Sequence, residues 1–141
     1  MADASGYEQP WGEQRSLLLV DAAQTLRLVA AHTADMTALA LCAAPDLPEV
    51  TVYGPPPEVP RAPVLACQVD GADPMDVARR LDELGVESRA GCHCATLAHR
   101  DLGLDPPASC RLSLAMYTSP DDVAQAMDAL AAVVHAVRRG R

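Results

Sequence analysis

Apolar residues in the first third of the chain recur at steps of three and four positions, a spacing that predicts a helix over 16–43. The residues predicted to face the core are Leu19, Ala22, Leu26, Val29, Met36 and Ala40. Pro45 and Pro48 end the helix because proline lacks the amide hydrogen that a helix interior needs. Its first residues, 17–20, also fit a short buried strand, so the start stays open between the two.

The residues before this helix show no periodicity. Positions 1–15 mix Gly, Pro, Glu and Gln and predict a flexible N-terminal arm, with docking through Tyr7 and Trp11 as the alternative. The length of 141 residues is that of one domain. We therefore expect an arm over 1–15 and a single domain over 16–141.

Short apolar runs between turn residues predict strands over 50–53, 64–69, 86–89 and 110–116. Two further helices carry start signals, because Asp73 and Ser119 are good N-caps and each is followed by proline. Their predicted buried residues are Val77, Leu81 and Leu84 in the first, and Val123, Met127, Leu130 and Val134 in the second. A short helix is expected over 95–102.

The order of these elements predicts the fold class. The predicted order is helix, strand, strand, helix, strand, loop, strand and helix. This order gives an α+β fold in which a small sheet of about four strands has helices packed on one face.

Charge and composition limit the class of partner. The net charge is −8, and all eleven basic residues are arginine, so we expect neither nucleic acid nor anionic membrane as a partner. No uninterrupted apolar run reaches the ~20 residues of a membrane span, and no signal peptide is visible. We expect a soluble cytoplasmic protein with reduced cysteines.

Two thiols flank an imidazole at Cys92, His93 and Cys94, directly after Gly91. Thiol chemistry is one interpretation, because His93, Arg89 or the start of the next helix can lower a thiol pKa. Burial as inert core residues is a second, and we expect it for Cys42 and Cys67. Zinc or iron ligation is the third. Its ligands would be Cys92, His93, Cys94, His99 and Cys110, although structural zinc sites use wider Cys pairs in two places.

The segments RAGCHCA at 89–95 and CRLSLAMYT at 110–118, followed by a capped helix, resemble the C-terminal small domain of cysteine desulfurases. These enzymes are class V aminotransferase-like and depend on pyridoxal phosphate. The resemblance extends over about 30–137. It implies the fold described above.

The resemblance also implies roles for single residues. Cys94 matches the nucleophile that carries sulfur from cysteine as a persulfide, and His93 matches a histidine beside it. Arg111 matches the arginine that holds the substrate carboxylate, and we add Arg89 as a second substrate-binding residue. Cys92 stands where the family often has histidine, and we interpret it as a resolving or relay thiol.

The chain has no lysine, and a pyridoxal-phosphate Schiff base needs one. We therefore expect no cofactor on this chain alone, and a protein partner that supplies the cofactor chemistry or the sulfur. A homodimer is the alternative assembly. The other functional hypotheses are an inactive partner-binding domain and a metal-binding module. Asp21 resembles a cofactor-pairing aspartate of the large domain, but a helix-capping role is the simpler interpretation.

Overall fold

A computed structural model describes the backbone of residues 12–140 and the side chains of residues 21–140. Four helices, one short 3-10 helix and four strands make up this part of the chain. In chain order they are α1 (Gly12–Ala43), η1 (Ala44–Asp46), β1 (Val50–Tyr53), β2 (Val64–Val69), α2 (Pro74–Glu83), β3 (Arg89–Gly91), α3 (Thr96–Asp101), β4 (Ser109–Ser113) and α4 (Pro120–Arg139).

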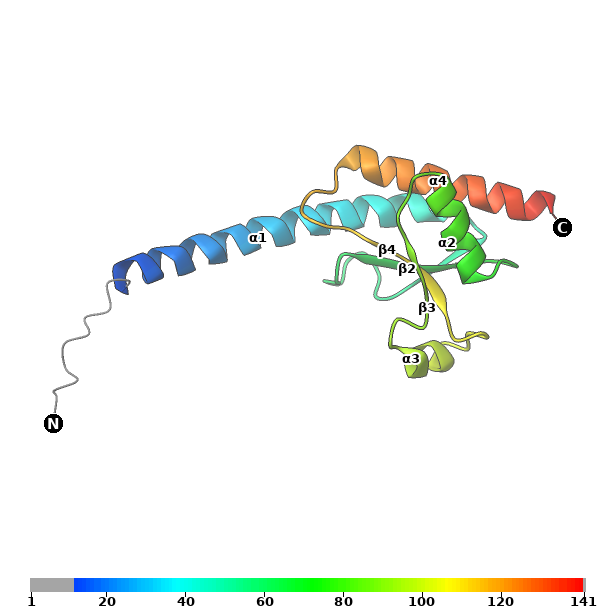
Figure 1. Ribbon diagram of the computed structural model, residues 1–141, viewed down its shortest axis with the longest axis horizontal. Helices are drawn as coiled ribbons and strands as arrows, with labels where there is room; N and C mark the ends of the chain where they lie inside the picture. Colours follow the sequence, from blue (N-terminus) through cyan, green and yellow to red (C-terminus); the bar gives the residue numbers. More distant parts are fainter. Residues whose placement is uncertain (1–11, 141) are drawn as a thin grey trace.

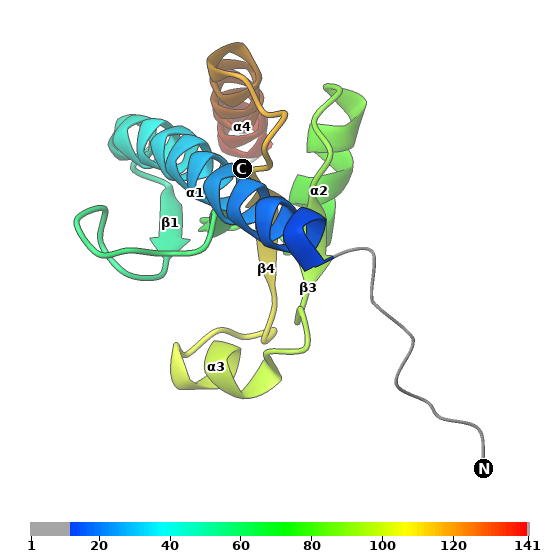
Figure 2. The same cartoon turned by 90° about the vertical axis from the view of Figure 1, so that its left-hand side faces the viewer.

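The strands form one antiparallel sheet in the order β1-β2-β4-β3. Helices α1, α2 and α4 lie together on one side of it, while α3 lies apart beyond the ends of β3 and β4 (Figures 1 and 2). The predicted α+β fold, a four-stranded sheet with helices on one face, is confirmed.

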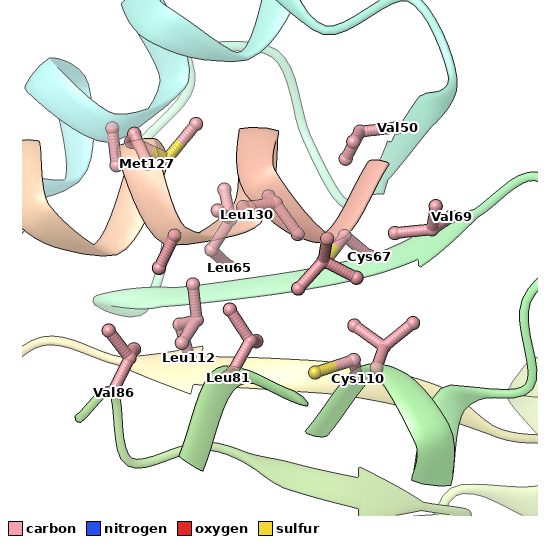
Figure 3. Packing of buried hydrophobic residues seen from close by; sticks show 14 of the residues in the cluster. Val50, Leu65, Cys67, Val69, Leu81, Val86, Cys110, Leu112, Met127 and Leu130 are labelled. Carbon is pink, nitrogen blue, oxygen red and sulfur yellow. The ribbon is translucent and has the colours of Figure 1, made fainter. Parts of the chain in front are cut away.

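Alternation along the central strands builds the core. In β2 the side chains of Leu65, Cys67 and Val69 are buried, while those between them are half-buried. Cys110 and Leu112 of β4 point to the same side, toward the helices (Figure 3). Burying such aliphatic side chains is worth about 1.5–3 kcal/mol each, so this layer is the main source of stability.

The two predicted N-caps are present. The Asp73 carboxylate accepts a hydrogen bond from the Met75 amide at 2.8 Å, and Gly85 ends α2 with a φ of 78°. At α4, Ser119 and Asp122 form a reciprocal capping box. Its predicted face is buried at all four positions: Val123, Met127, Leu130 and Val134.

The predicted buried face of α1 is wrong in its N-terminal half. Met36 and Ala40 are buried, but Ala22 is exposed, Leu26 is 68% exposed and Val29 is half-buried. Figure 1 shows the reason, because this half of α1 extends past the sheet and α4. The helix also begins at Gly12, which makes 17–20 helical rather than a strand. The side chain of Leu19, and residues 1–11 with Tyr7 and Trp11, lie outside the described residues.

One segment of the chain has the length and the apolar composition of a membrane-spanning helix. Asp21–Asp46 has the length and the mean hydropathy, 1.3, of a membrane helix, although Arg27 and Asp35 interrupt it. Length and composition alone are weak support, since core helices of soluble proteins have the same properties. Thr33, Met36 and Thr37 of this segment are buried within the domain, but only 28% of the apolar window is buried, so most of its surface faces outward.

Four other expectations need correction. The third strand is Arg89–Gly91 rather than 86–89, and the fourth ends at Ser113 rather than at 116, because a turn closed by Thr118 follows. Leu84 is 45% exposed because α2 ends before it. Cys42 is exposed on α1, whereas Cys67 is buried as predicted.

Candidate functional site

The Cys-His-Cys segment is a tight turn between β3 and α3. The Ala95 amide donates to the Cys92 carbonyl at 2.7 Å, which closes a four-residue turn. Its two central residues, His93 and Cys94, have φ values of 51° and 59°, and Gly91 before them has 127°. Positive φ is uncommon for residues other than glycine, so neighbouring contacts must hold this backbone.

Both thiols of the turn are exposed, but their surroundings differ. Hydrogen bonds from the Cys94 amide and the Thr96 hydroxyl lower the pKa of the Cys92 thiol, and the charge of Arg89 adds to this effect. A lowered pKa raises the thiolate fraction at neutral pH, and the thiolate is the nucleophile. The turn therefore activates Cys92 with its own backbone.

His93 points from the turn toward β4. Its Nε2 lies 3.0 Å from the Ser109 carbonyl, and because a carbonyl only accepts, Nε2 carries the proton. Burial lowers the pKa of His93, and the charges of Arg111, His99 and Arg89 lower it further. Its Nδ1 is buried and has no hydrogen-bond partner among the described residues. His93 is thus a neutral imidazole with one free acceptor.

A cleft of about 490 Å³ lies between the 85–89 segment, β4 and the start of α4. Arg89 and Arg111 both line it, and the strand register places them directly opposite each other. The Arg111 Nε is buried and has no hydrogen-bond partner among the described residues. Two arginines that line the same cleft suit a carboxylate or another small anion.

A second pair of thiols is buried in the core, on the neighbouring strands β2 and β4. Cys67 and Cys110 are directly opposed across β2 and β4, and both are 0% exposed. The contact with Cys67 and the nearby Ser88 hydroxyl lower the pKa of Cys110 to about 7, whereas the contact with Cys110 and burial raise the pKa of Cys67 well above its usual value. Cys110 is one of the predicted metal ligands, and its pairing with Cys67 follows only from strand register.

The structure brings Cys92, His93 and Cys94 together on one turn and Arg89 and Arg111 together in one cleft. Arg89 of β3 lines the cleft and lies three residues before Cys92, so β3 connects the cleft to the turn. His99 is bound to Ala95 and Ser109 instead of facing the thiols. Among the residues that the structure describes, no three His, Cys, Asp or Glu side chains form a group that could hold a metal ion.

Sequence reasoning missed Ser109 and Ser88. Both are small polar residues in apolar surroundings, and nothing in their spacing distinguishes them from ordinary strand and loop serines.

Comparison with known proteins gives one consistent result. The sequence profile of the family described as Aminotransferase class-V matches residues 12–126. A probable cysteine desulfurase of Halobacterium salinarum is 32% identical over 97% of this chain and 34% of its own length. A cysteine desulfurase of Dickeya dadantii is 34% identical over 88% of this chain and 26% of its own length.

Solved structures agree. The apo cysteine desulfurase of Thermococcus onnurineus NA1 superposes with a TM-score of 0.69 and 27% identity, over 80% of this chain and 27% of that one. The cysteine desulfurase CsdA of Escherichia coli, at 24% identity and a TM-score of 0.65, has the same fold. The chain spans about a quarter to a third of the length of the curated relatives it matches.

Proposed function

Because this chain belongs to the class-V aminotransferase family, we propose that it is a desulfurase-related sulfur carrier that holds transferred sulfur on Cys94 as a persulfide. The observation that carries this proposal is the turn at 92–95, which exposes two thiols beside a cleft lined by two arginines. Relatives named cysteine desulfurases support the same chemistry.

Pyridoxal phosphate does not fit the residues of this chain. The cofactor is held by a lysine amine, and the sequence contains none. The cleft offers guanidinium groups and hydroxyls but no amine nucleophile. We therefore propose that sulfur is released from cysteine at a site that carries the cofactor and lies outside these 141 residues, which take part only in the steps on thiols.

The proposed step is redox-neutral. The Cys94 thiolate attacks the outer sulfur of a donor persulfide, a new S–S bond forms on Cys94, and the donor leaves as a thiolate. Arg111 and Arg89 hold the donor's carboxylate in the cleft. The Cys94 thiol is exposed, so the proton that it loses passes to water.

Cys92 has the role of a relay in this proposal. Its thiolate attacks the outer sulfur on Cys94, which moves the persulfide to Cys92 and regenerates the Cys94 thiolate. The lowered pKa of Cys92 favours the attacking thiolate at neutral pH.

Incubation with cysteine persulfide, followed by site-resolved mass spectrometry, tests the proposal. We expect one added sulfur on Cys94 or Cys92, absent from Cys42, which is also exposed and serves as the internal control. Cys94→Ser should abolish loading of both turn thiols, whereas Cys92→Ser should leave sulfur on Cys94. Loading on Cys42 as fast as on the turn would contradict the proposal.

A second candidate function, a partner-binding domain without catalysis, is favoured by the exposed surface of α1. Leu26 and Leu28 are 68% and 66% exposed, and they lie in the half of α1 that extends past the sheet and α4 (Figure 1). Under this proposal the helix binds a protein partner or a second copy, and Cys94→Ser leaves that binding unchanged.

A further inference from the structure

Two histidines and one serine tie the Cys-His-Cys turn to β4. The Ser109 carbonyl accepts from His93, and the Ser109 hydroxyl lies 2.9 Å from Nε2 of His99. Nδ1 of His99 in turn lies 2.9 Å from the Ala95 carbonyl. Ser109 therefore holds the turn at two points, directly through His93 and through His99 at Ala95.

The chemistry of the partners fixes the direction of each bond. A carbonyl only accepts, so His99 donates through Nδ1–H to Ala95, and its Nε2 is left as an acceptor for the Ser109 hydroxyl. Both groups are shielded from water, because Ser109 is 1% and His99 is 7% exposed. Loss of one partner would leave the other buried without a hydrogen bond, which is costly.

The turn needs such support. Two adjacent residues other than glycine, His93 and Cys94, have left-handed backbone, and this conformation persists only where surrounding contacts determine it. The carbonyl that His99 holds belongs to Ala95, which closes the turn through its amide. The same turn aims the Cys94 amide at the Cys92 thiolate.

We propose that His99 and Ser109 are positioning residues, which hold the 92–95 turn in its left-handed conformation and thereby hold the Cys94 amide against the Cys92 sulfur. The inference deepens the proposed function, because the turn carries the thiols of that proposal. Its test does not depend on sulfur transfer, so the two can fail separately.

The experiment measures the rate of Cys92 alkylation by iodoacetamide against pH, with site-resolved mass spectrometry. In the unmodified protein we expect a midpoint below the ordinary thiol pKa of about 8.5. Ser109→Ala and His99→Leu should move the midpoint up toward about 8.5, because the relaxed turn no longer presents the Cys94 amide. Ser109→Thr, which keeps the hydroxyl, and His99→Asn, which keeps a donor for Ala95, should restore most of the shift.

Two control variants separate positioning from general loss of structure. Ser113→Ala removes an exposed serine from the same strand and should leave the midpoint unchanged. Thr96→Val removes the other donor to Cys92 and should raise the midpoint with the turn intact. If His99→Leu does not fold, Ser109→Ala alone decides the question. A folded Ser109→Ala protein whose Cys92 midpoint equals that of the unmodified protein would overturn the proposal.

Discussion

Alkylation of the native protein at neutral pH will show whether burial or ionisation governs the reactivity of Cys110. The pKa of this thiol, lowered to about 7, leaves it about half ionised at neutral pH, whereas an ordinary thiol with a pKa of about 8.5 is only about 3% ionised. Ionisation alone would make Cys110 roughly tenfold more reactive than an ordinary exposed thiol.

Burial acts in the opposite direction and is the larger effect. Cys110 is 0% exposed in a central strand, so iodoacetamide reaches it only after the sheet opens. Opening of a domain core costs about 5 kcal/mol or more, and each 1.4 kcal/mol is about a factor of ten, so the accessible fraction falls by about 10³ to 10⁴. We expect Cys110 to react at least about a hundredfold more slowly than an ordinary exposed thiol.

The assay is mass spectrometry of peptides after limited labelling. Cys92 and Cys94 should be labelled first, with Cys94 the most reactive by the family resemblance, and Cys67 and Cys110 only in urea. Leu130→Ala, a truncation at a fully buried position, should cost about 2–5 kcal/mol and raise Cys110 labelling about 30-fold or more. Native Cys110 labelled as fast as Cys92 would refute the reasoning.

Three further predictions concern stability and assembly. Ser119→Ala should lower the free energy of unfolding in urea by about 1 kcal/mol, because the capping box of α4 is lost; an unchanged midpoint would contradict it. The pKa of His93 is lowered in the folded state, so neutral His93 favours the folded protein. This contribution to the free energy of unfolding is present above the unfolded pKa of about 6.5 and is lost as pH falls. The urea midpoint should therefore decrease between about pH 7.5 and pH 5.5, and less so in His93→Gln. Sedimentation at micromolar concentration should show self-association that Leu26→Glu with Leu28→Glu abolishes, and a monomeric unmodified protein would exclude the homodimer.

The helices α2 and α4 could be predicted from the sequence because their signals are local. A cap, a proline at the first turn and an apolar stripe all lie within a few residues of one another, as at Ser119 and Val123. Strand β2 was predicted with the correct ends for the same reason. In each case the residues that determine the helix or strand lie within it or directly beside it.

The burial of α1 could not be predicted in this way. Its apolar spacing continues through Leu26 and Val29, yet burial depends on whether another element lies opposite, and none of the described elements does so beyond the edge of the sheet. Cys42 was misjudged for the same reason, because apolar neighbours in sequence do not place a side chain on the inner face.

The candidate site is only partly encoded in its motif. RAGCHCA predicts a loop with exposed thiols, because Gly91 permits a sharp turn and a Cys-x-Cys pair does not suit one helix face. The left-handed conformation of His93 and Cys94 does not follow from these residues, since it is held by Ser109, which is sixteen positions from His93 along the chain.

Strand register also makes the cleft. Arg89 and Arg111 face each other only because β3 begins at Arg89, and a shift of β3 by one residue would turn Arg89 toward the helices. The same register sets Ala90 against Cys110, which places a small side chain beside the buried thiol. A single feature, the pairing of β3 with β4, therefore positions the arginines, leads the chain into the thiol turn and brings Ser109 within reach of both histidines. Substitutions that weaken this pairing are expected to disturb cleft and turn together, whereas loss of Ser109 alone should disturb the turn and leave the two arginines in place.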